Sequence, residues 1–71
     1  MATNVEAEMV ANVWKVLIEV GGQVAEGDTL VILESMKMEM PVEAEDDGTV
    51  TEIVCAEGQS VSEGDTLVVL E

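Results

Sequence analysis

The sequence contains no histidine, tyrosine or phenylalanine, a single cysteine, a single proline and only two cations, Lys15 and Lys37. Without histidine, Cys55 lacks the base that commonly activates a thiol nucleophile, and a zinc site built from Cys and His is excluded. A lone cysteine cannot form a disulfide within the chain and is typical of a reducing, cytoplasmic environment. We therefore expect a cytoplasmic protein that is not itself an enzyme.

The charged residues of the chain are almost all acidic. Sixteen acidic residues face two basic ones in 71 residues, a formal net charge of −14. This charge disfavours nucleic acid, whose binding depends on cations that neutralise phosphates, and it disfavours anionic membrane surfaces. No apolar run approaches the roughly 18 residues of a membrane span. We expect no nucleic-acid or membrane partner, a monomer when isolated, and attraction toward basic protein surfaces.

The chain contains an internal repeat. After a shift of 37 positions, residues 4–34 align with residues 41–71, and fifteen of the 31 aligned positions are identical. The longest shared run is Glu26-Gly27-Asp28-Thr29-Leu30-Val31, which recurs at residues 63–68. Residues 35–40 join the two copies and have no counterpart. The sequence thus predicts two similar halves and one unique segment within a single domain of residues 1–71.

Short segments rich in β-branched residues alternate with glycine-containing turns. Such segments favour strands, and four are predicted: Val13–Ile18, Thr29–Leu33, Val50–Cys55 and Thr66–Leu70. Glycines mark the turns between them, and no window shows a sustained helical period. A duplicated unit of short strands predicts an all-β fold, a flattened barrel or sandwich of two small antiparallel sheets related by an internal pseudo-twofold axis.

The alignment of the two copies also assigns environments to single residues. Cys55 aligns with Ile18 and is expected to be a small buried hydrophobe. Trp14 aligns with Thr51 and is expected on the outer surface. Lys15 aligns with Glu52 in the other copy and is expected to face solvent.

The unique segment predicts a hairpin with Met36-Lys37 at its turn. Ser35 then faces Met38, Glu34 faces Glu39, and Leu33 faces Met40 on the outgoing strand. Pro41 lacks a backbone donor, so this strand is expected at a sheet edge. The turn lacks the Asn-Gly or Asp-Gly usual in two-residue hairpins, so positive φ at Met36 and Lys37 would be mildly strained. The symmetry places the two chain ends at the pole opposite Lys37.

The segment Ser35-Met36-Lys37-Met38 resembles the biotinylation motif of biotin carboxyl carrier domains, commonly Ala-Met-Lys-Met or Val-Met-Lys-Met. The apolar run before Glu34 and the continuation from Pro41 to Val50 are similar to the same family. The resemblance covers nearly the whole chain and extends to the minimal, free-standing carriers of bacterial acyl-CoA carboxylases. It implies the biotinyl/lipoyl-carrier fold, a barrel-sandwich hybrid.

The resemblance also implies a function. Lys37 would carry covalent biotin, with Met36 and Met38 as recognition flanks and Ser35, Glu34 and Glu39 beside them. A biotin protein ligase would attach the biotin. The carrier would then shuttle carboxybiotin between the biotin carboxylase and the carboxyltransferase of an acyl-CoA carboxylase, as a non-catalytic component of a multi-subunit enzyme. No metal site is expected.

Other interpretations remain open at this point. In isolation, Lys37 would be an ordinary solubilising lysine at a turn, but its exposed methionine neighbours argue for presentation. A lipoyl carrier, or one that accepts either biotin or lipoate, would share the fold and the lysine. Lipoyl domains usually have an acidic residue before the lysine and a small apolar one after it, unlike Met36 and Met38. An unmodified acidic interaction module of the same fold is the remaining alternative.

Overall fold

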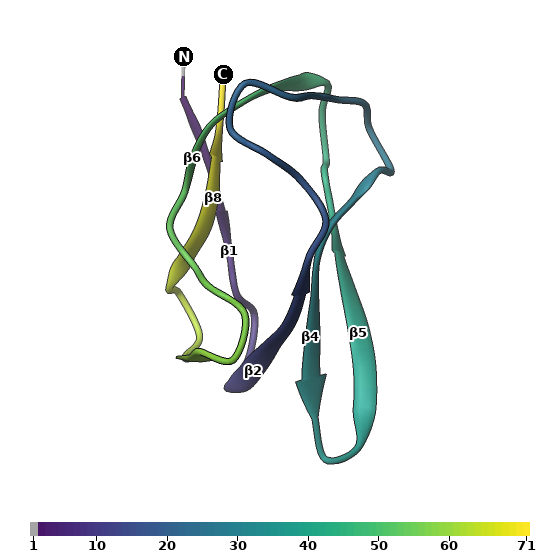
Figure 1. The fold of residues 1–71 in the computed structure, drawn as a ribbon, viewed down its shortest axis with the longest axis vertical. Coiled ribbons are helices and arrows are strands. Elements are labelled where there is room, and N and C mark those ends of the chain that lie inside the picture. The colour runs from purple at the N-terminus through teal and green to yellow at the C-terminus, as the bar shows by residue number, and fades with distance from the viewer. Residues whose placement is uncertain (1) are drawn as a thin grey trace.

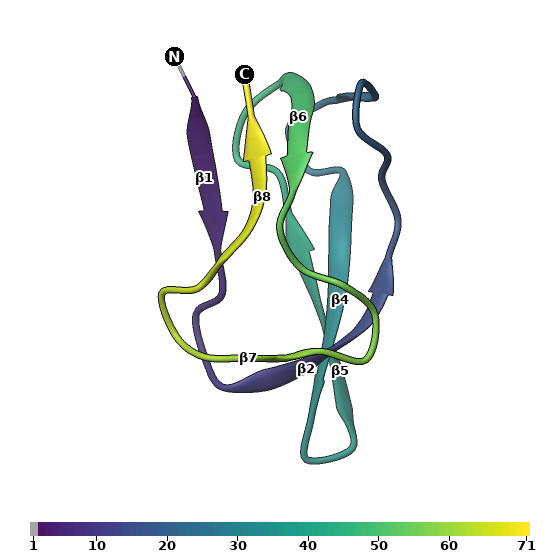
Figure 2. The ribbon, with the colours of Figure 1, turned by 60° about the vertical axis from the view of Figure 1, so that its left-hand side comes forward.

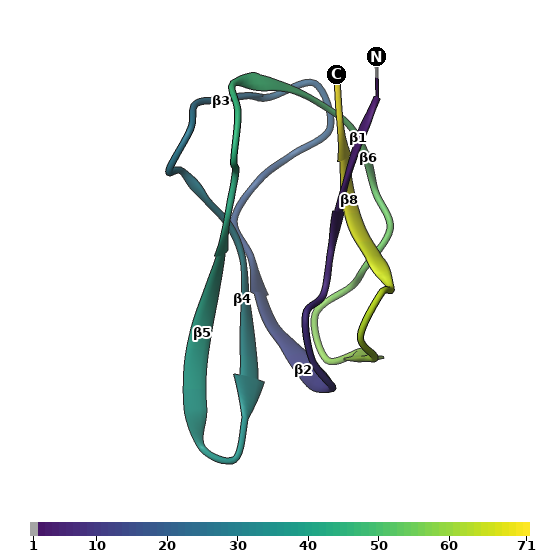
Figure 3. The same ribbon diagram turned by 180° about the vertical axis from the view of Figure 1, so that it is seen from behind.

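The computed structural model describes residues 2–71 and consists of eight β-strands, with no helix in that range (Figure 1). The strands form two four-stranded antiparallel sheets, in the orders β1-β8-β6-β3 and β5-β4-β2-β7. Figures 2 and 3 show these sheets as the two layers of a sandwich. The predicted all-β fold of two antiparallel sheets is confirmed. The strand bounds are β1 Thr3–Glu6, β2 Ala11–Val16, β3 Gln23–Val24, β4 Thr29–Ser35, β5 Met38–Glu43, β6 Gly48–Ile53, β7 Ser60–Val61 and β8 Thr66–Leu70.

The two sheets are equivalent under the sequence repeat. Strands β1, β2, β3 and β4 correspond to β5, β6, β7 and β8, and this exchange converts the order of one sheet into that of the other. The register is conserved as well, because the pair Asn4 and Val69 corresponds to the pair Pro41 and Ile32. The predicted pseudo-twofold is confirmed down to individual residue pairs.

Equivalent residues from both copies fill the core. The largest fully buried side chains come in matched pairs: Leu30 with Leu67, Val31 with Val68, and Val13 with Val50. Burial of each such side chain contributes roughly 1.5–3 kcal/mol. Each sheet supplies one member of every pair, so neither sheet could bury its apolar face without the other. Cys55 is also buried, and Trp14 is 42% exposed, both as predicted.

Four turns of one kind connect the strands. In residues 25–28, the amide of Asp28 donates to the carbonyl oxygen of Ala25 at 3.0 Å, and Gly27 between them has a φ of 90°. This combination fits a type II turn, whose third residue needs positive φ. The equivalent turn at residues 62–65 has Gly64 at a φ of 89°. Glycine is therefore required at these two positions by the backbone.

Three strands differ in their bounds from the predicted segments. Strand β4 ends at Ser35, two residues beyond the predicted end at Leu33. Strands β2 and β6 begin and end two residues earlier than the predicted segments 13–18 and 50–55. Ala11 is included because it pairs with Val61 of β7. Beyond β2, the amide of Leu17 still donates to Leu30 at 2.9 Å, but no regular ladder follows. Strand β1 was not predicted, because its four residues contain only one large apolar side chain.

None of the elements in residues 2–71 is a helix long and apolar enough to cross a membrane.

Candidate functional site: the lysine hairpin

The hairpin between β4 and β5 projects from one end of the sandwich, and the chain ends lie at the other end (Figure 1). The register pairs Ser35 with Met38 and Glu34 with Glu39. These two pairs are an extension of the sheet, because the equivalent pairing of β1 with β8 stops at Thr3 and Leu70. The predicted register and the predicted position of the chain ends are both confirmed.

Met36 and Lys37 form the two-residue turn, and both have positive φ, 52° and 66°. Two successive left-handed residues are the mark of a type I′ turn, which matches the twist of the flanking strands. Residues other than glycine, asparagine and aspartate seldom adopt this conformation. The tip therefore holds two long side chains in a backbone conformation that costs on the order of 1 kcal/mol or more for each residue.

The side chains at the tip are unusually exposed. Met36 is 92% exposed and Met38 65% exposed, and Lys37 is also exposed. Ser35 and Glu34 are half-buried, and Glu39 is exposed. The structure thus brings all six predicted site residues together in one projecting hairpin. Its exposed lysine lies between two flexible apolar side chains.

The other lysine has a different setting. Lys15 lies within β2, and its Nζ is 5.7 Å from the centroid of the adjacent Trp14 ring. It is exposed, as predicted, but its backbone is paired in the sheet and does not project from the fold. Both lysines are exposed, and what distinguishes Lys37 is its positive φ and its place at the turn of a projecting hairpin.

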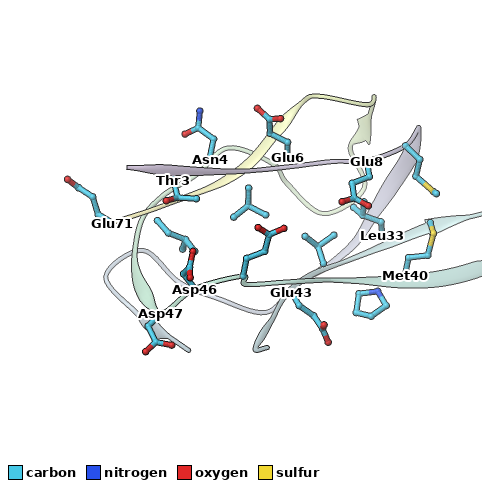
Figure 4. Close-up of a pocket in the computed structure, with 16 residues that line it drawn as sticks. Thr3, Asn4, Glu6, Glu8, Leu33, Met40, Glu43, Asp46, Asp47 and Glu71 are labelled. Atoms are coloured by element: carbon cyan, nitrogen blue, oxygen red, sulfur yellow. The ribbon is translucent and has the colours of Figure 1, made fainter. Parts of the chain in front are cut away.

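A cleft of about 450 Å³ separates the two edge strands β1 and β5 on one side of the sandwich (Figure 4). Its apolar lining includes Val5, Leu33 and Met40. Seven carboxylates also line it: Glu6, Glu8, Glu43, Glu45, Asp46, Asp47 and Glu71. Within residues 2–71 no group of three potential ligands is arranged to hold a metal ion. Lys37 does not line this cleft and lies outside it, on the projecting hairpin.

Met9 is an exposed residue that the sequence analysis did not select. It lies in the connection from β1 to β2 and lines the same cleft as Met40 of β5, which places it near the base of the hairpin. Its position depends on the packing of β1 beside β8, a long-range pairing that no motif in the sequence marks.

Cys55 has no role at this site. Its side chain is buried after β6, and burial raises the pKa of its thiol, which a backbone hydrogen bond partly offsets. A thiol that stays protonated is a poor nucleophile, so Cys55 contributes to packing.

Comparison with curated proteins finds relatives in bacteria. A protein of Mycolicibacterium smegmatis described as "Biotinylated protein TB7.3 homolog" is 62% identical over 42 residues, which span 59% of each chain. "Biotinylated protein TB7.3" of Mycobacterium bovis is 55% identical over the same length. "Biotin/lipoyl attachment protein" of Bacillus subtilis is 47% identical over 38 residues, 54% of this chain and 52% of that protein. The aligned part is thus little more than half of each relative.

Solved structures share the complete fold. A single-chain, multi-domain long-chain acyl-CoA carboxylase contains a segment that superimposes with a TM-score of 0.92 and 30% identity, covering 97% of this chain and 7% of that one. Kluyveromyces lactis urea carboxylase matches with a TM-score of 0.93 and 35% identity, covering 100% of this chain and 6% of that one. The family model described as "Biotin-requiring enzyme" matches residues 1–70. With the lysine hairpin in place, the chain belongs to the family of biotin/lipoyl attachment domains of biotin-requiring enzymes.

Proposed function

We propose that the protein is a biotin carboxyl carrier, biotinylated on Lys37, that carries a carboxyl group from a biotin carboxylase to the carboxyltransferase of an acyl-CoA carboxylase. The observation that carries the proposal is the projecting type I′ turn with Lys37 between Met36, 92% exposed, and Met38, 65% exposed. Relatives described as biotinylated proteins and neighbours that are carboxylases support biotin and carboxyl transfer.

In the attachment reaction the hairpin has to supply only an accessible lysine amine. A biotin protein ligase supplies biotin as its adenylate. The Lys37 Nζ attacks the acyl carbon, an amide bond forms, AMP leaves and the nitrogen releases a proton. The ligase has to take up the proton that the amine nitrogen releases. The carrier's contribution is to extend the amine far enough from its body to enter another protein's active site.

The absence of catalytic groups fits a carrier role. Within residues 2–71 the hairpin has no histidine or cysteine beside Lys37, and its neighbours Glu34 and Glu39 are paired across strands at the surface. The fold supports a stiff, double-stranded stem with a reactive amine at its end. Such a stem suits successive docking to a ligase, a carboxylase and a carboxyltransferase, and we expect it to act as a monomer in the cytoplasm.

The test is co-expression of the protein with biotin ligase and biotin, followed by intact mass and peptide mapping. We expect one biotinyl group, on the peptide that contains Lys37. Lys37→Arg should abolish it, and Lys15→Arg, the matched control, should leave it intact. Biotin retained by the Lys37→Arg variant would exclude this attachment site.

A second candidate is supported by one comparison. The Bacillus subtilis relative is described as a biotin/lipoyl attachment protein, so a lipoyl or dual carrier uses the same lysine. Parallel incubation with a lipoate ligase and lipoic acid distinguishes these cases by mass. If neither ligase modifies wild-type protein, the unmodified interaction module is the correct interpretation.

A further inference from the structure

The outer face of the lysine-bearing sheet has a feature that the fold does not need. In β2, Val13 pairs with Leu33, but Lys15 pairs with the very next residue of β4, Ile32, so Trp14 is an extra residue in a β-bulge. Val13 is buried and Val16 half-buried against the core. Because the bulge adds one residue between two inward positions, both Trp14 and Lys15 point outward.

These residues form a cross-strand row with their neighbours. Lys15 pairs with Ile32, and Ile32 pairs with Pro41 of β5. Trp14, Lys15 and Pro41 are exposed, and Ile32 is half-buried. We call these four residues the Trp14 row. It is an apolar strip across β2, β4 and β5 with one cation over its aromatic ring.

The repeat supplies an internal control for this row. The same bulge recurs in β6, where Val50 pairs with Leu70 and Glu52 with Val69. The outward residues there are Thr51, Glu52, Val69 and Asn4, which are mostly polar and carry no cation. Since that row folds equally well, the scaffold does not require a tryptophan, a lysine or a proline on its outer face. The departure is confined to the sheet that carries Lys37.

The row is continuous with the hairpin. Ile32 lies three residues before Ser35, the last residue of β4, which corresponds to about 10 Å along the strand, and the turn with Lys37 follows directly. Between them on the same face lie Glu34 and Glu39. A partner that covers this face therefore meets two carboxylates near the tip and an apolar strip with a single cation farther down.

We propose that the Trp14 row is the surface by which the biotinylated protein docks to its biotin carboxylase, an inference that rests on the function proposed above. The complementary surface has an apolar patch opposite Trp14, Ile32 and Pro41, a carboxylate opposite Lys15, and cations opposite Glu34 and Glu39. Tryptophan is among the side chains enriched in the residues that dominate binding energy at protein interfaces.

The distance favours the carboxylase over the ligase as occupant. Attachment requires the lysine amine itself to reach the ligase's active site, so the ligase must enclose the tip. The attached biotin lengthens the arm, which lets the enzyme that uses it hold the carrier body farther from its active site. A contact that begins about 10 Å below the turn suits the second situation.

The experiment replaces the row by its counterpart from the other copy. In the double variant Trp14→Thr/Ile32→Val, each new residue is one that the equivalent bulge already holds, and the net charge is unchanged. The reciprocal variant Thr51→Trp/Val69→Ile is the matched control. Both are biotinylated, and each serves as substrate for the biotin carboxylase of the same organism with ATP and bicarbonate, with free biotin as a surrogate substrate.

We expect kcat/KM for the double variant to fall about tenfold, mainly through KM, a change typical of the loss of an interface tryptophan. The control, the thermal unfolding midpoint and the ligation rate should be nearly unchanged. Lys15→Glu should lower kcat/KM further. Equal kcat/KM for wild type and double variant would overturn the inference while leaving the carrier function intact.

Other outcomes also decide against it. Slower ligation with unchanged carboxylase kinetics would assign the row to the ligase. Self-association of wild-type protein that the double variant loses, measured by sedimentation, would assign the row to a second copy of the chain. Wild-type protein that accepts no biotin would overturn the proposed function and this inference together.

Discussion

The two ends of the sandwich are built from the same repeat and differ in what they present. At one end the pairing of β1 with β8 stops at Thr3 and Leu70, and at the other β4 and β5 continue through two further residue pairs to Met36 and Lys37. Backbone hydrogen bonds correspond on both sides, as when Gly27 donates to Ala44 and Gly64 donates to Ala7, each at 2.9 Å. The comparison separates what the fold needs, which is duplicated, from what presents the lysine, which is not.

The largest expected change in stability comes from substitutions at two equivalent glycines, which test whether the two copies of the repeat are equivalent in energy. Gly27 and Gly64 have φ of 90° and 89°, and an added Cβ would meet no atom within 4 Å at either position. The cost of a side chain is therefore conformational and should be the same in both halves. We expect Gly27→Val and Gly64→Val each to lower the free energy of unfolding by about 1–3 kcal/mol, measured by urea denaturation.

The control for the glycine substitutions is asparagine, which tolerates positive φ better than other residues. Gly27→Asn and Gly64→Asn should cost less than the valine variants. A neutral valine substitution in one half, with a costly one in the other, would contradict the energetic equivalence of the two copies.

Much of this symmetry could be predicted from sequence, because identical residues at a fixed spacing impose identical turns and pairings. The hairpin register followed from the unique segment alone, and the type I′ turn places Lys37 where that register required. The bulge at Trp14 could not be predicted. Two consecutive outward residues between Val13 and Val16 break the strand period, and only the pairing with β4 shows which residue is extra. Strand β1 was missed because its four residues contain only one large apolar side chain, and its pairing with β8 joins residues far apart in the sequence.

A medium effect on stability is expected at the carboxylates that accept hydrogen bonds from the two equivalent turns, residues 25–28 and 62–65. The first turn has one such bond more than the second. Asp28 accepts from the amide of Ala25 at 2.9 Å, and Asp65 accepts equivalently from Ser62 at 2.8 Å. Asp47 accepts from the amide of Glu26 at 2.9 Å, and its counterpart Val10 can make no such bond. Each carboxylate should contribute about 1 kcal/mol.

The measurement for these bonds is the thermal or urea unfolding of single alanine variants. Asp28→Ala and Asp65→Ala should destabilise equally, Asp47→Ala by a similar amount, and Val10→Ala hardly at all. If Asp47→Ala were neutral, the first half would gain nothing from its additional bond, and the two halves would be closer in energy than their contacts indicate.

The smallest expected change in stability is at the residues with no counterpart at all. Met36 and Met38 are far more exposed than Met40, which packs against the core. Substitution of exposed turn residues typically changes stability by less than about 0.5 kcal/mol. The variant Met36→Asp/Met38→Ala should therefore unfold at nearly the wild-type midpoint, and Met40→Ala, the matched control, should be clearly less stable. Biotinylation of the double variant should slow, and attachment by a lipoate ligase should increase, because the new residues follow the acidic and small-apolar pattern of lipoyl domains. Unfolding of the double variant would show that these methionines stabilise the sandwich, and the division between a duplicated scaffold and a presenting hairpin would then be wrong.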